Sequence, residues 1–300
     1  MRAMSDEKKC LLIVNPVAGR KSIQKYIPQI VRVFMDAGYL VTTTVTAAKG
    51  EAEVLTREYA ASHDLIVAAG GDGTLNEVVA GLALAEISLP VGYIPCGSTN
   101  EFATAQHIPT DILAAARAIA DGNVRSLDLG KFGDHVFCGS AIFGAFSWMA
   151  YTTDQELKNR LGMGAYVLDG ALDPAMLKPW HMKITIGGVP HEDEYIFGAI
   201  SNAESLAGIL RYPEGLVSLN DGLLEVLLIR MPRNLAEWQQ VLHSIYAREI
   251  DSCPLVELAQ ANSIWVDNPD GLLWSLDGES SGVFRTAHIS VLPGALNLKG

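Results

Sequence analysis

The chain has 300 residues, of which 49% are hydrophobic and 19% are charged, and its formal net charge is −12. This composition can bury one large core or two smaller ones, and we expect two domains. A sequence pI near 5.0 argues against nucleic acid as a partner. No apolar run reaches the roughly 18 residues of a membrane span, since the longest candidate, Val136–Ala150, is interrupted by glycine and serine.

The start of the chain lacks the pattern of a secretion signal. Met1–Lys9 is charged, but the apolar stretch that follows it, Cys10–Val14, is too short for a signal peptide. We therefore expect a cytoplasmic protein. The cysteines are widely separated and form no CxxC pair, so we expect buried free thiols at Cys10, Cys96, Cys138 and Cys253.

The first 130 residues alternate β-branched runs with helical stretches, which predicts βαβ units and a parallel sheet covered by helices. The predicted strands are Leu11–Val14, Leu40–Val45, Leu65–Ala69, Val91–Ile94 and Ser126–Leu129. The predicted helices are Ile23–Met35, Glu51–Ala61, Leu75–Leu84 and Asp111–Ala120, with C-caps at Gly38 and Gly122. Ligands of such sheets bind beyond the carboxyl ends of the strands, where Asn15–Gly19, Gly70–Asn76 and Pro95–Asn100 fall.

From about Lys131 the pattern changes to strand-like runs separated by turns, which predicts a largely β second domain. One predicted helix, Leu235–Tyr246, interrupts it. The predicted strands are Met182–Ile186, Tyr195–Ile200, Leu223–Ile229, Ser263–Val266 and Leu272–Leu276.

The segment Gly70–Glu77 reads Gly-Gly-Asp-Gly-Thr-Leu-Asn-Glu between a predicted strand and a predicted helix. Its glycines let the backbone approach a ligand closely, and the helix that follows directs N–H groups and a positive dipole end at an anion. Asp72 would repel a phosphate unless a divalent cation lay between them, so the motif indicates Mg²⁺ and a nucleoside triphosphate. A tight surface turn is the structural alternative.

Spacing excludes the two common phosphate motifs. Gly19-Arg20-Lys21-Ser22 imitates the end of a Walker A loop, but Val14 stands where the opening glycine should be. The dinucleotide fingerprint also fails, because Asn76 replaces its third glycine.

Taken together, these motifs make the chain resemble the diacylglycerol-kinase-like lipid kinases, relatives of the sphingosine, ceramide and NAD kinases. The resemblance covers most of the length. The resemblance rests on five motifs that occur in the same order as in the family: Asn15-Pro16-x-x-Gly19, Gly70-Gly71-Asp72-Gly73-Thr74-x-Asn76-Glu77, Pro95-x-Gly97-Ser98-x-Asn100, Asn220-Asp221-Gly222-x-Leu224 and Leu276-Asp277-Gly278-Glu279.

The resemblance implies a phosphotransferase that moves the γ-phosphoryl group of ATP, with Mg²⁺, to a lipid hydroxyl, diacylglycerol being the leading acceptor. It also implies an α/β fold with a parallel-sheet nucleotide-binding domain, to which a tail of about 286–300 returns. The change of sequence pattern places this domain at residues 1–128. A larger β-rich, sandwich-like acceptor domain, residues 129–285, would follow. The active site would lie in the cleft between the two domains.

By the same resemblance, the nucleotide-binding residues are Asn15, Pro16, Gly19, Thr46, Gly70, Gly71, Asp72, Gly73, Thr74, Asn76, Glu77, Gly97, Ser98 and Asn100. Thr46 has an equal alternative as an ordinary residue at the end of a strand, because Thr42–Thr46 has strand composition.

Glu279 matches the proton acceptor of the family, since an attacking hydroxyl must lose a proton to a group within hydrogen-bond reach. Asp277 is a candidate for sharing that role. Asp72 and Glu101 are further catalytic candidates, as residues that would hold the catalytic Mg²⁺. The structural alternative for Asp277-Gly278-Glu279 is a β-turn with two acids.

A second Mg²⁺, structural in the family, would be held by Ser218, Asp221 and Leu223 through a carboxylate and main-chain carbonyls, which are ligands that a hard cation prefers. Asn220-Asp221-Gly222 is also a strong turn sequence, so a hairpin without metal stays open. The seven histidines show no ligand spacing.

The chain departs from the family pattern at three positions. Glu101 stands where the family carries aspartate, and its extra methylene moves the carboxylate by about one bond length. Ser98 replaces threonine and keeps the hydroxyl, whereas Thr104 stands where relatives often carry arginine. Glu101 and Thr104 leave open a catalytically weak nucleotide- or lipid-binding regulator as a rival interpretation.

Residues 126–300 hold 11 Lys and Arg against 21 Asp and Glu, and so carry ten of the twelve net negative charges. An acidic acceptor domain is repelled by an anionic bilayer, so we expect transient contact with a membrane rather than stable anchoring. NAD-kinase-type and sphingosine-type activities are the enzymatic alternatives. The acceptor lipid and the oligomeric state, a homodimer included, stay open.

Overall fold

The computed structural model describes residues 7–19, 23–98, 100–144, 178–206 and 210–300. The chain divides into two compact units. Unit 1 comprises Met1–Leu129 with Pro293–Gly300, and unit 2 comprises Gly130–Leu292. The apolar stretch Val136–Ala150 therefore lies only partly within the described residues.

Unit 1 contains a parallel sheet in the strand order β4-β3-β1-β2, and the end of β15 lies parallel beside β4. Every residue of β3 is buried, because helices cover both faces of the sheet. The parallel sheet predicted from the βαβ pattern is thus confirmed. The strands are β1 (Lys8–Val14), β2 (Tyr39–Val45), β3 (Leu65–Gly70), β4 (Pro90–Pro95) and β15 (Glu279–Lys299).

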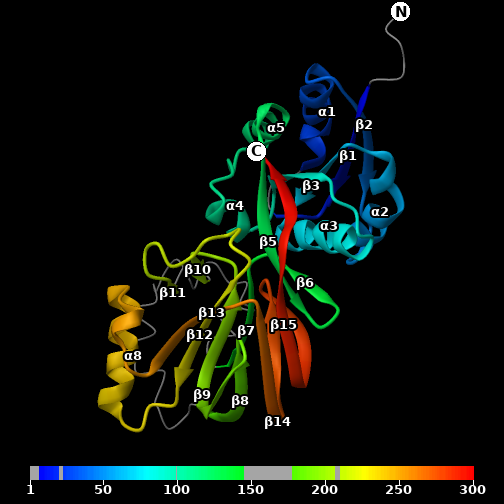
Figure 1. Cartoon of the computed structure of the whole chain (residues 1–300). Helices are drawn as coiled ribbons and strands as arrows, with labels where there is room; N and C mark the ends of the chain where they lie inside the picture. Colours follow the sequence, from blue (N-terminus) through cyan, green and yellow to red (C-terminus); the bar gives the residue numbers. More distant parts are fainter. Residues whose placement is uncertain (1–6, 20–22, 99, 145–177, 207–209) are drawn as a thin grey trace, which may run out of the picture. The chain divides into compact units, whose positions relative to one another are not determined.

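Figure 1 shows α1 and α5 over one face of this sheet and α2 and α3 over the other. Pro28 lies in the first turn of α1 and divides the predicted helix that begins at Ile23 into a 3₁₀ turn followed by an α-helix. The helices are η1 (Ile23–Tyr26), α1 (Ile27–Asp36), α2 (Glu51–Tyr59), η2 (Ala60–Ser62), α3 (Asp72–Leu84), α4 (Glu101–Ala105) and α5 (Ile112–Asp121).

Helix α3 begins at Asp72, three residues before the predicted start at Leu75. Gly71 is its N-cap, and the Thr74 and Leu75 nitrogens donate to the Gly71 carbonyl. The glycine-rich segment expected to be a loop is therefore largely the first turn of a helix. This position brings the helix N-terminus, with its unpaired N–H groups, directly to the end of β3.

Unit 2 is rich in β-structure, as predicted from its alternating pattern. Its hydrogen-bonded strands close a circuit, because β8 and β7 each pair with both β9 and β14. The register of β14 shifts between Asp267 and Leu272, where the strand leaves β8 for β7. The strands are β6 (His135–Phe137), β7 (Ser140–Gly144), β8 (Trp180–Ile186), β9 (Val189–Ser201), β10 (Ser205–Leu206), β11 (Leu210–Arg211), β12 (Leu224–Arg230), β13 (Val256–Ala261) and β14 (Ser263–Leu276).

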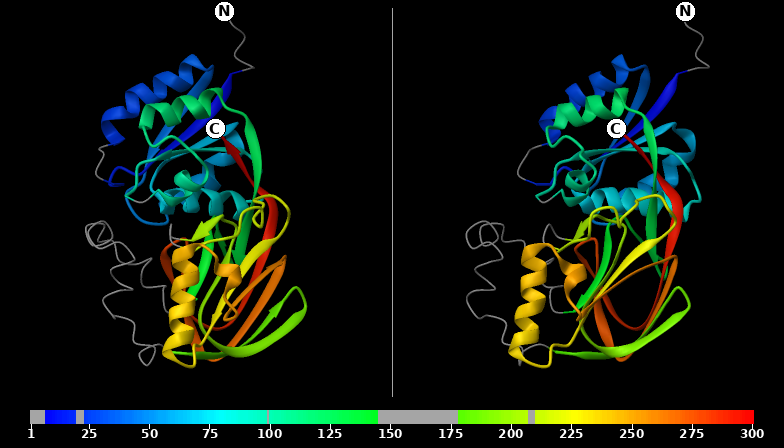
Figure 2. Two further views of the ribbon diagram at one scale, coloured as in Figure 1. Left: turned by 90° about the vertical axis from the view of Figure 1, so that its left-hand side faces the viewer. Right: turned by 60° about the vertical axis from the view of Figure 1, so that its left-hand side comes forward.

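Helix α8 (Leu235–Ala247) lies along the strands of unit 2 and is followed by η4 (Ile250–Ser252) (Figure 2). The Asn234 side chain caps its N-terminus by accepting from the Glu237 nitrogen. Trp238 and Val241 bury its apolar face in a core shared with β9 and β12. The predicted helix Leu235–Tyr246 is confirmed, one residue longer at its end.

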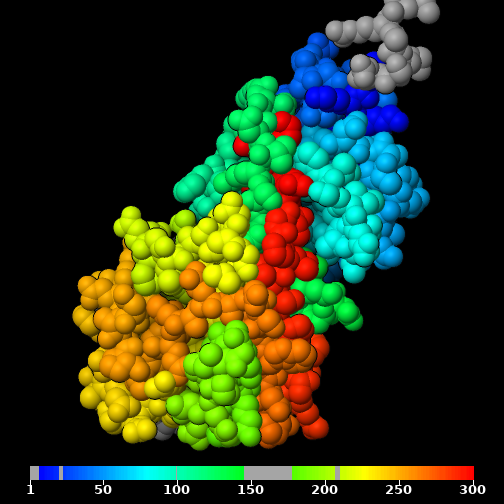
Figure 3. Space-filling model, viewed as in Figure 1, coloured from blue at the N-terminus to red at the C-terminus, as the bar shows by residue number. Residues whose placement is uncertain are grey.

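Strand β5 (Val124–Phe132) pairs with β15, and Figure 3 shows the red surface of β15 bordered by the green surface of the segment that contains β5. Buried Asp128 accepts a hydrogen bond of 2.7 Å from the Gly294 nitrogen and so joins the two strands. The four cysteines are buried and free, as predicted. No helix in the described part of the chain is long and apolar enough to cross a membrane.

Candidate functional site

Three segments that follow parallel strands of unit 1 lie in contact with one another. Asn15, directly after β1, donates from its side chain to the Thr74 hydroxyl in α3 over 3.2 Å. The same side chain accepts from the Val17 nitrogen, which fixes the turn around Pro16. Asn15 therefore ties the first segment to the start of α3, as expected when strand ends share one edge of a sheet.

Glycines allow these segments to approach more closely than any side chain would permit. A Cβ atom at Gly19 would collide with the carbonyl oxygen of Cys96, and one at Gly97 would lie 2.7 Å from the Gly71 Cα atom. A Cβ at Gly70 would collide with the Thr74 side chain. Gly19 also has a φ of +62°, a conformation that other residues adopt at a cost.

The Asp72 carboxylate connects the start of α3 to the segment after β4. Its Oδ1 accepts from the Tyr93 hydroxyl over 3.1 Å, and its Oδ2 accepts from the Glu101 nitrogen over 2.9 Å. A carboxylate has about four lone-pair sites, so each of its oxygens can accept from more than one donor. Donors on both oxygens therefore hold Asp72 between the start of α3 and the segment after β4.

Asn100 adopts a left-handed conformation, with a φ of +49°, at the start of α4. Its amide nitrogen donates to the Gly97 carbonyl over 3.0 Å, and its main-chain oxygen accepts from the Thr104 hydroxyl. This turn positions the Glu101 nitrogen toward Asp72, while the side chains of Ser98 and Glu101 are exposed.

Glu77 caps the N-terminus of a neighbouring helix. Its two carboxylate oxygens accept from the Gly50 and Ala52 nitrogens, over 2.8 and 3.1 Å, at the N-terminus of α2. A negative charge at this place satisfies unpaired N–H groups and opposes the positive end of the helix dipole. Gly73 lies in the first turn of α3 and Asn76 in its second turn.

Thr46 is buried at the end of β2. Its nitrogen donates to the Val14 carbonyl over 2.9 Å, and its hydroxyl lies 3.5 Å from the same oxygen. These contacts fit the strand-end interpretation of Thr46 as well as a role beside a nucleotide.

In unit 2, Asp277 and Gly278 form the two-residue turn between β14 and β15, and both have positive φ angles. The Asp277 carboxylate accepts three main-chain hydrogen bonds of 2.7–2.9 Å, from the nitrogens of Cys138, Gly139 and Ser140. Asp277 thus anchors the turn to the segment before β7. Glu279 follows as the first residue of β15, and its side chain is exposed.

The segment Ser218–Leu223 is a turn in which the Asp221 carboxylate accepts from the Leu223 nitrogen over 3.0 Å. The exposed Ser218 hydroxyl lies 3.3 Å from the Asn220 side-chain oxygen. Among the described residues, no three His, Cys, Asp or Glu side chains are grouped to hold a metal ion. The oxygen donors present, one carboxylate with carbonyls and a hydroxyl, fit Mg²⁺ only if water completes its coordination.

Glu225 lies close to this turn and is fully buried in β12. Burial raises the pKa of its carboxyl group to about 7, although the Gln260 amide that it accepts from lowers the pKa and Asp221 adds a smaller increase. Its second oxygen, Oε2, has no hydrogen-bond partner among the described residues. The sequence motifs did not point to this group.

Tyr93 is the principal site residue that the sequence motifs missed. It is fully buried in β4, and its hydroxyl contacts Asp72 and, over 3.5 Å, Asn100. The available signal was a tyrosine inside a strand expected to be covered on both faces, because a buried phenol hydroxyl needs a partner.

Two family models together match most of the chain. Residues 9–132 match the diacylglycerol kinase catalytic domain, and residues 144–300 match the YegS C-terminal NAD kinase beta sandwich-like domain. A diacylglycerol kinase of Bacillus subtilis is 34% identical, with 92% of this chain and 91% of the relative covered. A diacylglycerol kinase of Staphylococcus saprophyticus is 30% identical, with 92% and 90% covered.

A solved structure has the same fold along nearly its whole length. It is a Bacillus anthracis protein described as a candidate diacylglycerol kinase, 28% identical, with a TM-score of 0.81 over 99% of this chain and 98% of that one.

Proposed function

Because the chain belongs to the diacylglycerol kinase family, whose members are phosphotransferases with an alcohol acceptor, we propose that it is an ATP- and Mg²⁺-dependent lipid kinase. The γ-phosphoryl group of ATP is transferred to a lipid hydroxyl. Diacylglycerol is the proposed acceptor, since relatives at 30% identity or more carry that name.

One observation of the structure carries the nucleotide part of this proposal. The segments after β1, β3 and β4 converge at the N-terminus of α3, and glycine is required where they touch. A helix N-terminus reached without intervening side chains is suited to phosphate. We assign the nucleotide to this place, with Asn15, Pro16, Gly19, Thr46, Gly70, Gly71, Asp72, Gly73, Thr74, Asn76, Gly97, Ser98 and Asn100 around it.

We assign supporting roles to two acids, Asp72 of this set and Glu77 beside it. Asp72 holds the segment after β4 through the Glu101 nitrogen, and its negative charge beside the phosphates would favour the nucleotide-bound Mg²⁺. Glu77 acts through α2, because both of its oxygens are engaged there. Bound Mg²⁺ would neutralise phosphate charge and orient the transferred group.

Glu279 is the proposed proton acceptor. Its carboxylate is exposed, and it stands at the start of β15 directly after the turn that Asp277 anchors. Asp277, with three N–H bonds to its oxygens, is better suited to position Glu279 than to take a proton itself. Ser218, Asp221 and Leu223 are the proposed ligands of a second, structural Mg²⁺. The expectation that the reaction takes place between the nucleotide-binding and acceptor domains stays a prediction.

We propose only brief contact with a membrane, because the residues after 125 carry most of the net negative charge. A transient encounter would suffice to collect a lipid acceptor whose acyl chains stay in the bilayer.

The test is to incubate the purified chain with Mg²⁺ and γ-labelled ATP, with diacylglycerol in mixed micelles, sphingosine and NAD offered in parallel. We expect label in diacylglycerol and its loss when Mg²⁺ is chelated. Faster labelling of NAD or sphingosine would replace the proposed acceptor. ATP binding without any labelled product would favour the regulator interpretation.

If turnover is low, the variant Glu101→Asp tests whether an impaired catalytic site, rather than an unsuitable acceptor, is the cause. If the extra methylene of Glu101 misplaces its carboxylate, the shorter side chain should raise turnover. No gain in turnover would show that Glu101 does not limit the reaction.

A further inference from the structure

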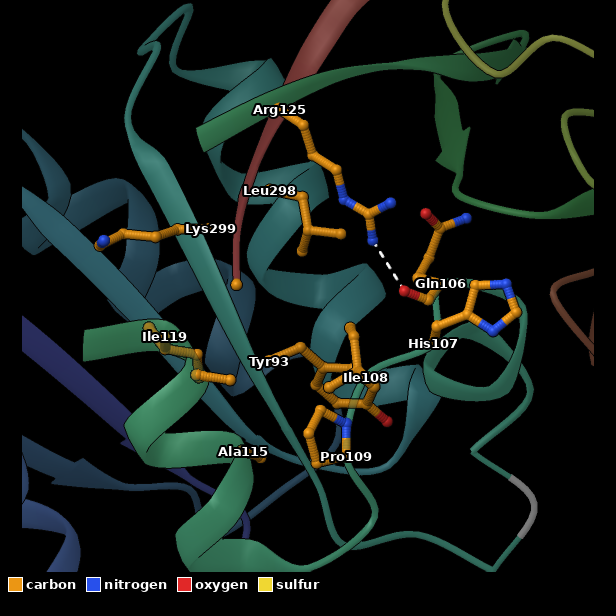
Figure 4. A pocket seen from close by; sticks show the side chains of 12 residues that line it. Tyr93, Gln106, His107, Ile108, Pro109, Ala115, Ile119, Arg125, Leu298 and Lys299 are labelled. Carbon is orange, nitrogen blue, oxygen red and sulfur yellow. Dashed lines mark hydrogen bonds between the residues drawn. The ribbon is translucent and has the colours of Figure 1, made fainter. Parts of the chain in front are cut away.

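Unit 1 contains a cavity of about 250 Å³ away from the glycine contacts. It lies between β4, α5, the segment that follows α4, and the end of β15 (Figure 4). All of these elements belong to unit 1. The volume is slightly below the roughly 300–1,000 Å³ of sites for drug-sized ligands, so an occupant would be small.

The wall of the cavity combines an apolar surface with positive charge. Ile108, Ile119 and Leu298 supply much of the apolar surface, and Arg125 reaches from β5 toward the Gln106 carbonyl (Figure 4). Lys299 points away on the other side of its strand and donates to the Gly122 carbonyl. Of the residues that the structure describes, no aspartate or glutamate lines the cavity, although the chain carries a net charge of −12.

Gln106 supplies an acceptor that lacks a donor. The residue is 7% exposed, and its side-chain oxygen is buried without a hydrogen-bond partner in the described part of the chain. A buried acceptor left unsatisfied costs about 1–3 kcal/mol, and a donor from a ligand would remove that cost. The main-chain oxygen of Gln106 already accepts from Arg125 Nη2 over 2.8 Å.

We propose that this cavity binds a small organic anion that combines an apolar body with a hydroxyl or amine donor. The acid group pairs with the Arg125 guanidinium, whose remaining N–H groups match a carboxylate or phosphate. The apolar body packs on Ile108 and Leu298. The donor bonds to the side-chain oxygen of Gln106.

The cavity shares two elements with the proposed nucleotide site. Tyr93 lines the cavity, and its hydroxyl donates to Asp72. Gln106 follows α4, its nitrogen donates to the Phe102 carbonyl, and α4 begins at Glu101, whose nitrogen also donates to Asp72. An occupant that orders these elements changes the affinity for nucleotide, and nucleotide changes the affinity for the occupant by the same factor. This coupling rests on the proposed function, whereas the binding itself does not.

The binding test uses the full chain without nucleotide and three probes of similar size: 4-hydroxybenzoate, 4-hydroxybenzamide and 4-methylbenzoate. The first has both the acid and the donor, the second lacks the charge, and the third lacks the donor. By titration calorimetry or ligand-observed NMR, we expect 4-hydroxybenzoate to bind with a Kd of about 1 mM or lower and each analogue at least about fivefold more weakly. No binding of 4-hydroxybenzoate at about 10 mM would overturn the proposal.

Variants locate the probe. Arg125→Gln should weaken binding at least about tenfold, and Ala118→Met should abolish it by filling the cavity from α5. Ala114→Met is the matched control, because Ala114 lies on the same helix and does not line the cavity. Equal thermal denaturation midpoints for the two methionine variants would show that both fold. Unchanged binding in Arg125→Gln or Ala118→Met would place the probe elsewhere and overturn the proposal.

The coupling is measured separately, as the Kd of a non-hydrolysable ATP analogue with and without saturating 4-hydroxybenzoate. We expect a change of at least about threefold, absent in Ala118→Met. Probe binding with no change in the Kd would keep the cavity as a binding site and reject the coupling. Failure of the analogue to bind in either condition would contradict the proposed nucleotide site instead.

Discussion

The Oδ2 atom of Asp72 lies 2.9 Å from the main-chain nitrogen of Glu101, so the first residue of α3 fixes the first residue of α4. The side chain of residue 101 is free to vary without breaking this bond, because only its main chain takes part. A change of side chain at residue 101 therefore leaves this link between the two helices intact.

Asp72→Asn should lower kcat by about 10² or more, because an amide supplies one acceptor oxygen where two donors now converge and removes the negative charge. Tyr93→Phe is the matched control, since it removes only the hydroxyl at 3.1 Å and keeps the charge. We expect its kcat to fall less than about tenfold. Equal losses of kcat in steady-state assays of the two variants would mean that Asp72 acts only by holding the segment after β4.

Gly19→Ala should abolish binding of an ATP analogue while the chain still folds, because its Cβ would collide with the Cys96 carbonyl. Gly38→Ala shares the strain of a positive φ, at +89°, but has no atom within 4 Å of the new Cβ. It should lose about 1 kcal/mol of stability and no affinity. Calorimetric titration of both variants separates the clash from the strain, and normal affinity in Gly19→Ala would refute the close-approach argument.

Glu279→Gln should leave the Kd of ATP nearly unchanged and lower turnover by about 10² or more, because the amide cannot accept a proton. Single-turnover measurements with saturating lipid report the chemical step directly. Unchanged turnover in this variant would exclude Glu279 as the general base.

Asp277→Asn should act first on stability. The amide group has one acceptor oxygen for three N–H donors, and its own NH₂ group would face one of them. We expect a loss of about 1–3 kcal/mol in the free energy of unfolding by urea. A stable variant with turnover as low as that of Glu279→Gln would instead assign the proton transfer to Asp277.

Glu225 makes stability depend on pH. Its pKa rises on folding from an ordinary 4.5 to about 7, so the folded state binds more protons than the unfolded state between these values. The free energy of unfolding should therefore fall as pH rises from about 4.5 to 7, by no more than about 3 kcal/mol from this group.

Glu225→Gln cannot ionise, so we expect it to be more stable than the parent chain at pH 8 and similar at pH 4.5. Urea denaturation in the presence of EDTA measures the free energy of unfolding without a cation bound near this carboxyl group. The same pH dependence in both proteins would show that Glu225 does not hold its proton on folding.

The sequence predicted the parts of this molecule that follow from local pattern. The βαβ order, the free cysteines and the glycine-rich segments could be predicted from the sequence. Hydrophobic period, residue spacing and the lack of a Cβ atom are all properties of residues close together in the chain. The start of α3 was placed three residues late, because glycine lowers helix propensity while packing against the other loops favours the helix.

The hydrogen-bond partners of individual acidic residues could not be predicted from the sequence. Glu77 reaches α2 and Asp277 reaches the segment before β7, which lie 25 or more and 137 or more residues away along the chain. Only the folded chain brings such partners together, so a motif could name these residues without revealing what they hold. Tyr93 was missed for the same reason, since its partner Asp72 belongs to another element.

The pairing of Asn297 and Leu298 with Pro90 and Val91 has a consequence for biosynthesis. The edge of β4 cannot gain this neighbour until Asn297 and Leu298 have left the ribosome. At about 5–20 residues per second, that edge waits for roughly 10–40 s after its own synthesis. An open strand edge is a template for pairing with other chains, so the nascent protein should depend on chaperones during this interval.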